Sequence, residues 1–391
     1  MSKHLTEAAT QLSWWLRLPP TNLIDRGDHV RFRYAVYLMI HQIVTVLYGI
    51  NGLPEIMYYP SQLDGARNQL DRLVKSPKRA GTSLCKLASE RAPQKAWADA
   101  AILIRATLEL LEKTSIDYYP RDQEIKEGAF KSDQSRDPND LYTCAADLAS
   151  RLQFLEGVEI IALGGSLGRG FADRQSDIDL LVFGAGIPQA NNRRRLISKW
   201  PAIRYGPLIE PACDSVLIDG VMVHVRYWTT RTVDEMLAEF PKPPAQRILA
   251  EELQCSHGLV DKNGRLLQWK QSLEQLSPEL IAVVFEGVHA RLPRFRRQWE
   301  IAYTSNERIH LYCLINQAVN DLLIALYIRN GRFLSTPRWS HKDIQTFDIV
   351  PPKLETSLPQ LVDGISDEEN PGGRWHGLEE IWAGMFHMPS G

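Results

Sequence analysis

The chain has 391 residues, of which 44% are hydrophobic and 24% are charged. This length and composition predict a soluble enzyme with a large core and two or three domains. The net charge of −2 and the pI of about 6.6 leave no global basic field of the kind that nonspecific nucleic-acid binding requires. The composition therefore argues against a polymerase or a tailing enzyme, and makes nucleic acid an unlikely partner.

The five cysteines are scattered and form no Cys-x-x-Cys pair: Cys85, Cys144, Cys213, Cys255 and Cys313. This pattern predicts neither a zinc site nor a disulfide framework, only free thiols in a reducing compartment. The N-terminus has no apolar signal-peptide core. We therefore expect a cytoplasmic protein.

The first 140 residues predict a helical region. The clearest helices are expected over residues 28–50, 61–75 and 93–114, and the charged stretch 118–140 is expected to be a linker or a mobile loop. The apolar stretch 34–50 contains His41, Gln42 and Thr45, and is shorter than the roughly 20 residues that a bilayer span needs. We predict a buried core helix there, and no membrane partner.

A short similarity links the two ends of the chain. Residues 47–52 resemble residues 326–331, and each segment ends a long apolar helix at an Asn-Gly pair. The Asn-Gly pair predicts a left-handed C-cap in both helices. Two interpretations stay open: a duplicated helical unit that flanks a central domain, or chance similarity.

A glycine-rich turn lies near the middle of the chain. An amphipathic helix is expected over residues 141–156 and a strand over 158–163, followed by Gly-Gly-Ser-Leu-Gly-Arg-Gly at 164–170. Glycines let the backbone pass close to phosphate oxygens, and successive free N–H groups form an anion-binding nest. Ser166 adds a hydroxyl donor and Arg169 a cation, so the segment predicts a phosphate-binding turn.

Two carboxylates one residue apart follow the turn, in the sequence Ser-Asp-Ile-Asp-Leu at 176–180. In an extended strand, residues i and i+2 point to the same face, so Asp177 and Asp179 can bind one hard cation together. The intervening Ile178 then faces the core. The pattern predicts a site for Mg²⁺, or Mn²⁺, on a strand.

The turn and the paired carboxylates together resemble the signature of the nucleotidyltransferase superfamily, typified by DNA polymerase beta and the aminoglycoside nucleotidyltransferases. In that family the Gly-Ser turn holds the outer phosphates of a nucleoside triphosphate, and Asp-x-Asp on the next strand binds magnesium that bridges the phosphates. The resemblance implies nucleotide binding, with ATP as the expected triphosphate, by Gly164, Gly165, Ser166, Arg169 and Ser176. It implies that Asp177 and Asp179 are catalytic metal ligands.

The order of the segments is also similar to that of bacterial proteins with a DUF4037-type C-terminal domain. In both, a transferase core precedes a helical domain with a Tyr-x-x-Asn-Gly segment, here at residues 327–331.

The sequence departs from the family at the expected third carboxylate. Strands are predicted over residues 214–218 and 221–228, joined by Asp219-Gly220, a type I′ hairpin signal. The buried side of the second strand is predicted to carry Val221, Val223 and Val225, and the other side Met222, His224 and Arg226. The family's third acid is expected near the middle of that strand, where this chain has His224.

Three roles for His224 stay open. It is a base that accepts the proton of an acceptor hydroxyl, a cation that binds phosphate, or a polar residue in a site without full activity. Asp214 and Glu210 remain alternative sources of the missing acid, and Asp219 is expected only to form the turn.

The remaining sequence predicts helices with basic surfaces. Residues 191–199, with three consecutive arginines, are interpreted as a solvated helix face, with an acceptor-binding patch as the alternative. Helices are expected over 232–240 and 244–253, and a connecting loop over 259–266. A helical bundle is expected from residue 275 onward.

The first long helix of that bundle carries a basic cluster: His289, Arg291, Arg294, Arg296 and Arg297. By the family resemblance, one or two of these arginines reach the triphosphate; the alternative is pairing with acids such as Glu286 and Glu300. Residues 370–376 are expected to form a turn before a last helix at 378–386.

These observations predict an α+β nucleotidyltransferase fold, a small mixed sheet with helices, flanked by helical domains. The expected divisions are 1–140, 141–270 and 271–391. The expected activity is metal-dependent transfer of a nucleoside monophosphate to a hydroxyl of a small molecule, with release of pyrophosphate. The alternative is a nucleotide-binding regulatory or toxin–antitoxin-type protein that modifies a partner protein or has lost full transferase activity.

Overall fold

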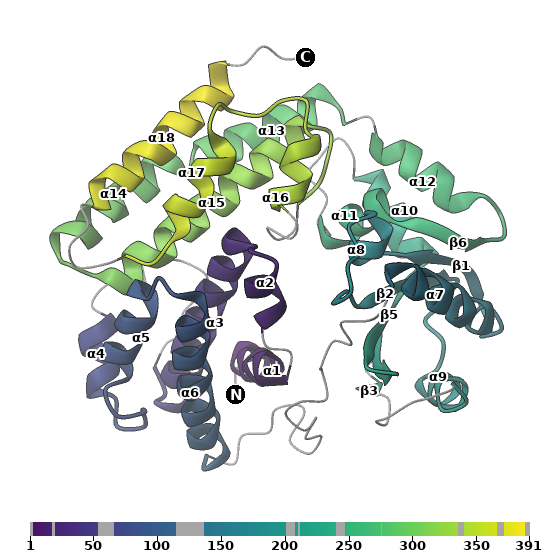
Figure 1. Cartoon of the computed structure of the whole chain (residues 1–391), viewed down its shortest axis with the longest axis horizontal. Coiled ribbons are helices and arrows are strands. Elements are labelled where there is room, and N and C mark those ends of the chain that lie inside the picture. The colour runs from purple at the N-terminus through teal and green to yellow at the C-terminus, as the bar shows by residue number, and fades with distance from the viewer. Residues whose placement is uncertain are drawn as a thin grey trace. The chain divides into compact units, whose positions relative to one another are not determined.

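The computed structural model describes residues 3–17, 20–53, 66–114, 137–200, 208–209, 212–239, 247–274, 276–334, 340–365 and 371–387. The chain forms two compact units (Figure 1). One contains residues 1–124, 286–326 and 336–391, and the other contains residues 125–285 and 327–335. The helices expected in separate N- and C-terminal domains therefore belong largely to a single unit.

The first unit is helical. Its N-terminal helices are α1 (Lys3–Arg17), α2 (Thr21–Asp25), α3 (His29–Ile50), α4 (Ala66–Arg72), α5 (Ala80–Ser89) and α6 (Pro93–Glu112). Its C-terminal elements are α14 (Leu292–Thr304), most of α15 (Arg308–Arg329), α16 (Ser340–Asp343), η2 (Ile344–Thr346), α17 (Leu354–Val362) and α18 (Pro371–His387). The helix α13 (Pro278–His289) spans the boundary between the two units.

The predicted C-caps of α3 and α15 are both confirmed. Gly52 has φ +68° and Gly331 has φ +70°, the left-handed conformation that glycine adopts without steric strain. In each case the N–H after the glycine donates to a carbonyl of the last helical turn: Leu53 to Tyr48 at 3.0 Å, and Arg332 to Tyr327 at 2.9 Å. A shared cap geometry is common among helices, so it does not decide between duplication and chance similarity.

The long apolar helices are core elements. Within the described part of the chain, α15, with 22 residues, is the one helix long and apolar enough to cross a membrane. Its most apolar 18-residue window has a mean hydropathy of 1.5, and 89% of that window is buried inside the structure. In α3 the polar His41, Gln42 and Thr45 are also buried. The prediction of a buried core helix over 34–50 is confirmed.

The second unit is built on a mixed sheet. Over the described residues its strands are β1 (Val158–Leu163), β2 (Ile178–Gly184), β3 (Leu208–Ile209), β4 (Cys213–Ile218), β5 (Val221–Thr229) and β6 (His257–Asp261). Their order is β3-β4-β5-β2-β1-β6, with β2 and β5 parallel and the other neighbours antiparallel. The helices of this unit are α7 (Pro138–Leu152), α8 (Gly165–Gly168), α9 (Ala190–Ile197), α10 (Thr230–Ala238), α11 (Arg247–Cys255) and α12 (Arg265–Glu274). The α+β fold class is confirmed.

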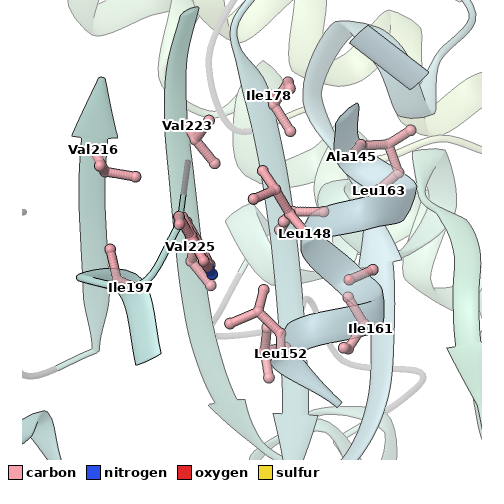
Figure 2. Close-up of a cluster of buried hydrophobic side chains, with 14 of the residues drawn as sticks. Ala145, Leu148, Leu152, Ile161, Leu163, Ile178, Ile197, Val216, Val223 and Val225 are labelled. Carbon is pink, nitrogen blue, oxygen red and sulfur yellow. The ribbon is translucent and has the colours of Figure 1, made fainter. Parts of the chain in front are cut away.

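One face of this sheet forms the core of the unit. Ile178, Leu180 and Val182 of β2 share one face with Val221, Val223 and Val225 of β5, and this face is buried with residues of α7 and α9. Figure 2 shows Leu148 and Leu152 of α7 gathered with Ile178, Val223 and Val225 of the strands. The opposite face of β2 and β5 carries the polar residues on which the site depends.

The β4–β5 hairpin has the predicted turn. Asp219 has φ +46° and Gly220 has φ +78°, and Ile218 pairs with Val221 across the turn. Two successive positive φ values define a type I′ turn. The buried side of β5 is the predicted one, with Val221, Val223 and Val225 all at most 6% exposed.

The prediction of a loop over 259–266 is wrong. Residues 257–261 form β6 along the outer edge of β1, and α12 begins at Arg265. The two apolar residues of β6, Leu259 and Val260, are adjacent and do not alternate with polar ones, and its pairing with β1 supplies the strand hydrogen bonds. Asp261 then caps α12, because its carboxylate accepts from the N–H groups of Arg265 and Leu266, both at 3.0 Å.

Two helix starts also differ from expectation, and both place proline at the first helical position. Asp137 caps α7, so residues 138–140 are helical rather than part of a linker; residues 118–136 lie outside the described residues. The turn expected over 370–376 is instead the first part of α18, which begins at Pro371. Of the helix expected over 61–75, residues 66–72 form α4, and residues 61–65 lie outside the described residues.

Candidate active site

The Gly-Ser turn forms the single helical turn α8, held by close backbone contacts. The Gly164 N–H donates to the Asp179 carbonyl at 2.8 Å, which ties the turn to β2. A Cβ at Gly168 would lie 2.4 Å from the Leu163 carbonyl oxygen and 2.8 Å from that of Cys255. Glycine at this position therefore lets β1 and the end of α11 approach the turn closely.

Gly165 leaves room for the second carboxylate of the Asp-x-Asp pair. Its φ is +58°, and a Cβ there would lie 2.1 Å from Oδ2 of Asp179. Any side chain at this position would displace the carboxylate and strain the backbone. The Asp179 carboxylate therefore lies directly against the backbone of the predicted phosphate-binding turn.

Asp177 and Asp179 flank a buried residue at the start of β2. Ile178 is fully buried in the core, whereas both aspartates are partly exposed. The strand alternation directs the two carboxylates away from the core. This is the arrangement that the Asp-x-Asp pattern predicts for a strand.

The two carboxylates fit a cation that arrives with a phosphate ligand. Among the described residues, no group of three or more His, Cys, Asp or Glu side chains is arranged to hold a metal ion. Mg²⁺ keeps several waters and is commonly bound by one or two carboxylates together with substrate phosphates. The contact of Asp179 with Gly165 brings such a carboxylate beside the turn, so the donor set suits Mg²⁺ or Mn²⁺ shared with a nucleotide.

Three of the predicted nucleotide-binding side chains are buried or engaged within the protein. Ser166 is 6% exposed. Ser176 accepts from the Asp173 N–H at 2.9 Å and donates to Asp173 Oδ1 at 3.1 Å, so its hydroxyl stabilises the loop before β2. Arg169 is ion-paired with Glu251 of α11 at 2.5 Å, and both side chains are under a tenth exposed. Because Arg169 is paired in this way, the backbone N–H groups of the turn are better placed than the Arg169 side chain to donate hydrogen bonds to phosphate.

His224 lies on the carboxylate face of the sheet. It pairs with Asp179 in the parallel register of β2 and β5, and with Ser215 in the antiparallel register of β4 and β5. Residues paired in this way share a face. The Ser215 hydroxyl and His224 Nδ1 are 2.9 Å apart, so the imidazole is held away from the core on the side where the aspartates lie.

Asp214 lies on the opposite, core face of β4. It is fully buried and accepts from the Arg193 guanidinium and from the Tyr227 hydroxyl, both at 2.8 Å. The Arg193 guanidinium also lies over the Tyr227 ring, 4.6 Å from its centroid. Burial, reinforced by the Asp214 charge, raises the pKa of the Tyr227 phenol far above its ordinary value. Asp214 therefore has a structural role, and Glu210, the other alternative to the third acid, lies outside the described residues.

The same network corrects the interpretation of the three arginines near residue 194. Arg194 and Arg195 are exposed on α9, as a solvated helix face predicts. Arg193 is 1% exposed and is paired with Asp214. Its position inside a charged triplet hides its role in the sequence, because only the fold places a buried carboxylate opposite it.

Sequence reasoning missed the contribution of α11. Arg226 lies with Nη2 3.4 Å from Asp179 Oδ1, and its Nη1 is ion-paired with Glu252. The preceding residue, Glu251, holds Arg169. Two adjacent glutamates of α11 thus hold one arginine from the turn and one from β5. Adjacent acids in a helix are a weak sequence signal, since they are also common on solvent faces.

The basic cluster of α14 lies in the other unit. Arg291 is paired with Asp321 at 2.7 Å, and Arg296 lies 3.3 Å from Glu300 and 3.2 Å from Glu379. For these two arginines the predicted alternative of pairing with acids is observed.

Known proteins resemble the part of the chain that carries the turn and the two aspartates. A family model described as a nucleotidyltransferase domain matches residues 146–204, which include the turn, Asp177 and Asp179. Among solved structures, the chain is similar to a nucleotidyltransferase-like protein from Exiguobacterium sibiricum, with 13% identity and a TM-score of 0.32 over 62% of this chain and 74% of that one. No curated protein matches the sequence.

Proposed function

We propose, from the premise that a nucleotidyltransferase domain occupies residues 146–204, that the chain transfers a nucleoside monophosphate from a triphosphate to a hydroxyl of a small molecule. ATP is the expected donor. The observation that carries the proposal is the contact between Gly165 and Asp179, in which the absence of a Cβ brings a carboxylate against the turn. The phosphates bound by the turn would then also be ligands of the cation that the carboxylates bind.

The residues of the domain divide the chemistry between them. Asp177 and Asp179 would hold Mg²⁺, which when bound stabilises negative charge on the phosphates and on the leaving pyrophosphate. The backbone N–H groups of α8 would orient the triphosphate. His224, held through Nδ1 by Ser215, would accept the hydroxyl proton as the acceptor oxygen bonds to the α-phosphorus and the bond to pyrophosphate breaks.

A second candidate function retains nucleotide binding but assigns the protein a different role. It is a regulatory or toxin–antitoxin-type protein that modifies a partner protein or lacks full transferase activity. His224 in place of the third acid and Arg226 beside Asp179 both favour it, because each lowers the negative charge available to a metal.

One experiment tests both candidates. The full chain is incubated with each α-labelled nucleoside triphosphate, Mg²⁺, and either a metabolite pool or a protein pool, and labelled product and pyrophosphate are measured. The double variant Asp177→Asn/Asp179→Asn is expected to abolish both signals, and Asp219→Asn in the exposed hairpin turn is the matched control. Label on a metabolite supports the first candidate, and label on a protein supports the second. Equal behaviour of wild type and the double variant with both pools would show that the transferase proposal is wrong.

A further inference from the structure

Arg226 lies between two carboxylates beside the proposed metal site. Its Nη2 is 3.4 Å from Asp179 Oδ1, and its Nη1 is ion-paired with Oε1 of Glu252. The side chains of Arg226, Asp179 and Glu252 are 24%, 18% and 12% exposed, so solvent screens their charges only in part. The arginine therefore partly neutralises a carboxylate that the proposed function assigns to a cation.

The Arg226 guanidinium has a second hydrogen-bonding arrangement available, in which it binds both oxygens of Glu252. The 3.4 Å distance to Asp179 is longer than the 2.7–3.2 Å of an ordinary N–H···O hydrogen bond. Oε2 of Glu252 is buried and has no hydrogen-bond partner among the residues that the structure describes, which is unfavourable for a carboxylate oxygen. Arginine pairs best with a carboxylate through two parallel N–H···O bonds. Movement of the guanidinium onto both oxygens of Glu252 would satisfy Oε2 and release Asp179.

We propose that Arg226 is a positioning residue that exchanges between Asp179 and Glu252. In the nucleotide-free protein it competes with cations for Asp179; when Mg²⁺ arrives with a triphosphate, it moves onto both oxygens of Glu252. The proposal rests on the proposed function, since it takes Asp179 as a metal ligand. It adds that α11 controls metal loading, and that the cation binds tightly only together with the nucleotide.

The size of the competition follows from the charges involved. The positive charge of the Arg226 guanidinium lies 3.4 Å from one oxygen of Asp179. The same positive charge opposes another cation at that carboxylate, by about tenfold or more in affinity. Phosphate oxygens add ligands and negative charge, so a cation that brings a triphosphate displaces the arginine more readily than a free one.

The test measures Mn²⁺ binding to the nucleotide-free full chain, from the electron paramagnetic resonance signal of free Mn²⁺. Arg226→Gln is expected to bind Mn²⁺ about tenfold or more tightly than wild type. Arg231→Gln is the matched control: it removes the same charge from an exposed pair with Glu235 and is expected to leave the affinity unchanged. Equal Mn²⁺ affinities for the two variants would overturn the proposal.

A double-mutant cycle tests the part played by Glu252. Arg226→Gln alone leaves Glu252 without its partner, so Arg226→Gln/Glu252→Gln is measured as well, because it removes both charges. This double variant is also expected to bind Mn²⁺ more tightly than wild type. Glu252→Gln is expected to weaken Mn²⁺ binding about tenfold when Arg226 is present, and by less than about threefold when residue 226 is Gln. Equal effects in the two backgrounds would show that Glu252 acts by its charge alone, and would exclude the exchange.

Failure of this inference can be separated from failure of the proposed function. Equilibrium dialysis of wild type with Mn²⁺ and labelled ATP measures binding to the complete site. If ATP is not retained, or if Asp177→Asn/Asp179→Asn retains it equally with Mn²⁺, the proposed function fails and this inference fails with it. If retention depends on the aspartates while Arg226→Gln leaves nucleotide-free Mn²⁺ binding unchanged, only the exchange of Arg226 is wrong.

Discussion

The backbone conformation of Gly165 and the position of the Asp179 carboxylate depend on each other. Its φ of +58° and the 2.1 Å between a Cβ and Asp179 Oδ2 mean that Gly165→Ala must displace the carboxylate. A displacement of about 1 Å in a reacting site lowers the rate about 100-fold. We therefore expect Gly165→Ala to lower nucleotidyl transfer about 100-fold or more, measured as labelled pyrophosphate released.

Gly170 is the matched control for this prediction. It also has a positive φ, +72°, but a Cβ there meets nothing within 4 Å. Both alanine variants should lose about 1–2 kcal/mol of stability from the left-handed conformation. An equal loss of activity in both would show that backbone strain, and not displacement of Asp179, is responsible.

Tyr227 stabilises the mixed sheet from its core face. Its hydroxyl donates to Asp214, which is fully buried and also bound by Arg193. A hydrogen bond to a buried charged group contributes about 1.5–3 kcal/mol. We expect Tyr227→Phe to lower the free energy of unfolding by that amount at neutral pH, measured by urea denaturation. Because the ring stays in place, Arg193 keeps its aromatic neighbour, and an unchanged stability would mean that Arg193 alone satisfies Asp214.

The contribution of Tyr227 depends on pH in the alkaline range. Burial raises the pKa of its phenol in the folded protein above the ordinary value of 10.0. Below pH 10 the phenol is protonated in both folded and unfolded chains; above it, only the unfolded chain ionises, so stability falls as pH rises. The stability advantage of wild type over Tyr227→Phe is therefore expected to shrink above pH 10. An advantage that stays constant up to the alkaline unfolding limit would contradict the raised pKa.

At the level of single residues, sequence patterns identify the candidate site residues better than they identify the residues that these contact. The period of two in a strand is enough to place Asp177 and Asp179 on the face opposite Ile178. It does not reveal that Ser215 lies beside His224, because that contact depends on the hairpin register. The carboxylate of Glu252 is further from prediction still, since its neighbour Arg226 comes from another element.

The helix α11 is the element that holds the glycine turn in place. Glu251 binds Arg169 with both side chains under a tenth exposed, and the Cys255 carbonyl lies against Gly168. Breaking a buried ion pair by removing one partner destabilises a protein by about 3–5 kcal/mol. Glu251→Gln is therefore expected to lower the free energy of unfolding by about 3 kcal/mol, measured by urea denaturation without nucleotide.

The double variant Glu251→Gln/Arg169→Gln separates a structural role of Arg169 from a phosphate-binding one. It leaves no uncompensated charge, so it should be more stable than Glu251→Gln alone. Glu235→Gln on α10, which removes an exposed acid of the same unit, should leave stability unchanged. If Glu251→Gln/Arg169→Gln keeps full stability while its ATP affinity falls, Arg169 is a phosphate ligand and the structural interpretation is wrong.

Strands and helices with a strong hydrophobic period can be predicted from the sequence, whereas elements that depend on pairing with another element cannot. β1, β2, β4 and β5 follow from alternating or continuous apolar runs, and the hairpin from Asp219-Gly220. β6 has no such pattern, because it is an edge strand whose hydrogen bonds come from β1. The start of α18 was hidden by Pro-Gly-Gly, which is typical of a turn, although proline also suits a first helical position.

At the scale of the whole chain, the largest departure from the sequence expectation is the union of the two terminal regions in one unit. Arg33 of α3, only 2% exposed, donates to the carbonyls of Glu90 and Arg91 at 2.6 Å and 2.5 Å, and to the Asp363 carboxylate at 2.5 Å. Its own carbonyl accepts from the Tyr312 hydroxyl at 3.0 Å. A single buried arginine thus joins segments about 330 residues apart. Sequence periodicity marks each helix but carries no information about such long-range partners.

Arg33→Met tests whether the N- and C-terminal helices fold together. The variant removes the donor to two carbonyls and to Asp363, which keeps only the Gly364 N–H at 2.9 Å and Arg91 at 3.9 Å. We therefore expect it to destabilise the helical unit by about 3–5 kcal/mol. Hydrogen exchange should then show that amides of α3 and α17 lose protection together, while those of β1 and β2 in the other unit keep theirs.

Arg296→Met is the control, because it removes an exposed cation of the same unit that pairs with Glu300 and Glu379, and little change is expected. The joint loss in α3 and α17 follows from the contacts of Arg33, since Asp363 directly follows α17 and shares the guanidinium with the segment after α5. Loss of protection confined to α3 would mean that the terminal helices are stable independently, as an organisation into three separate domains predicts.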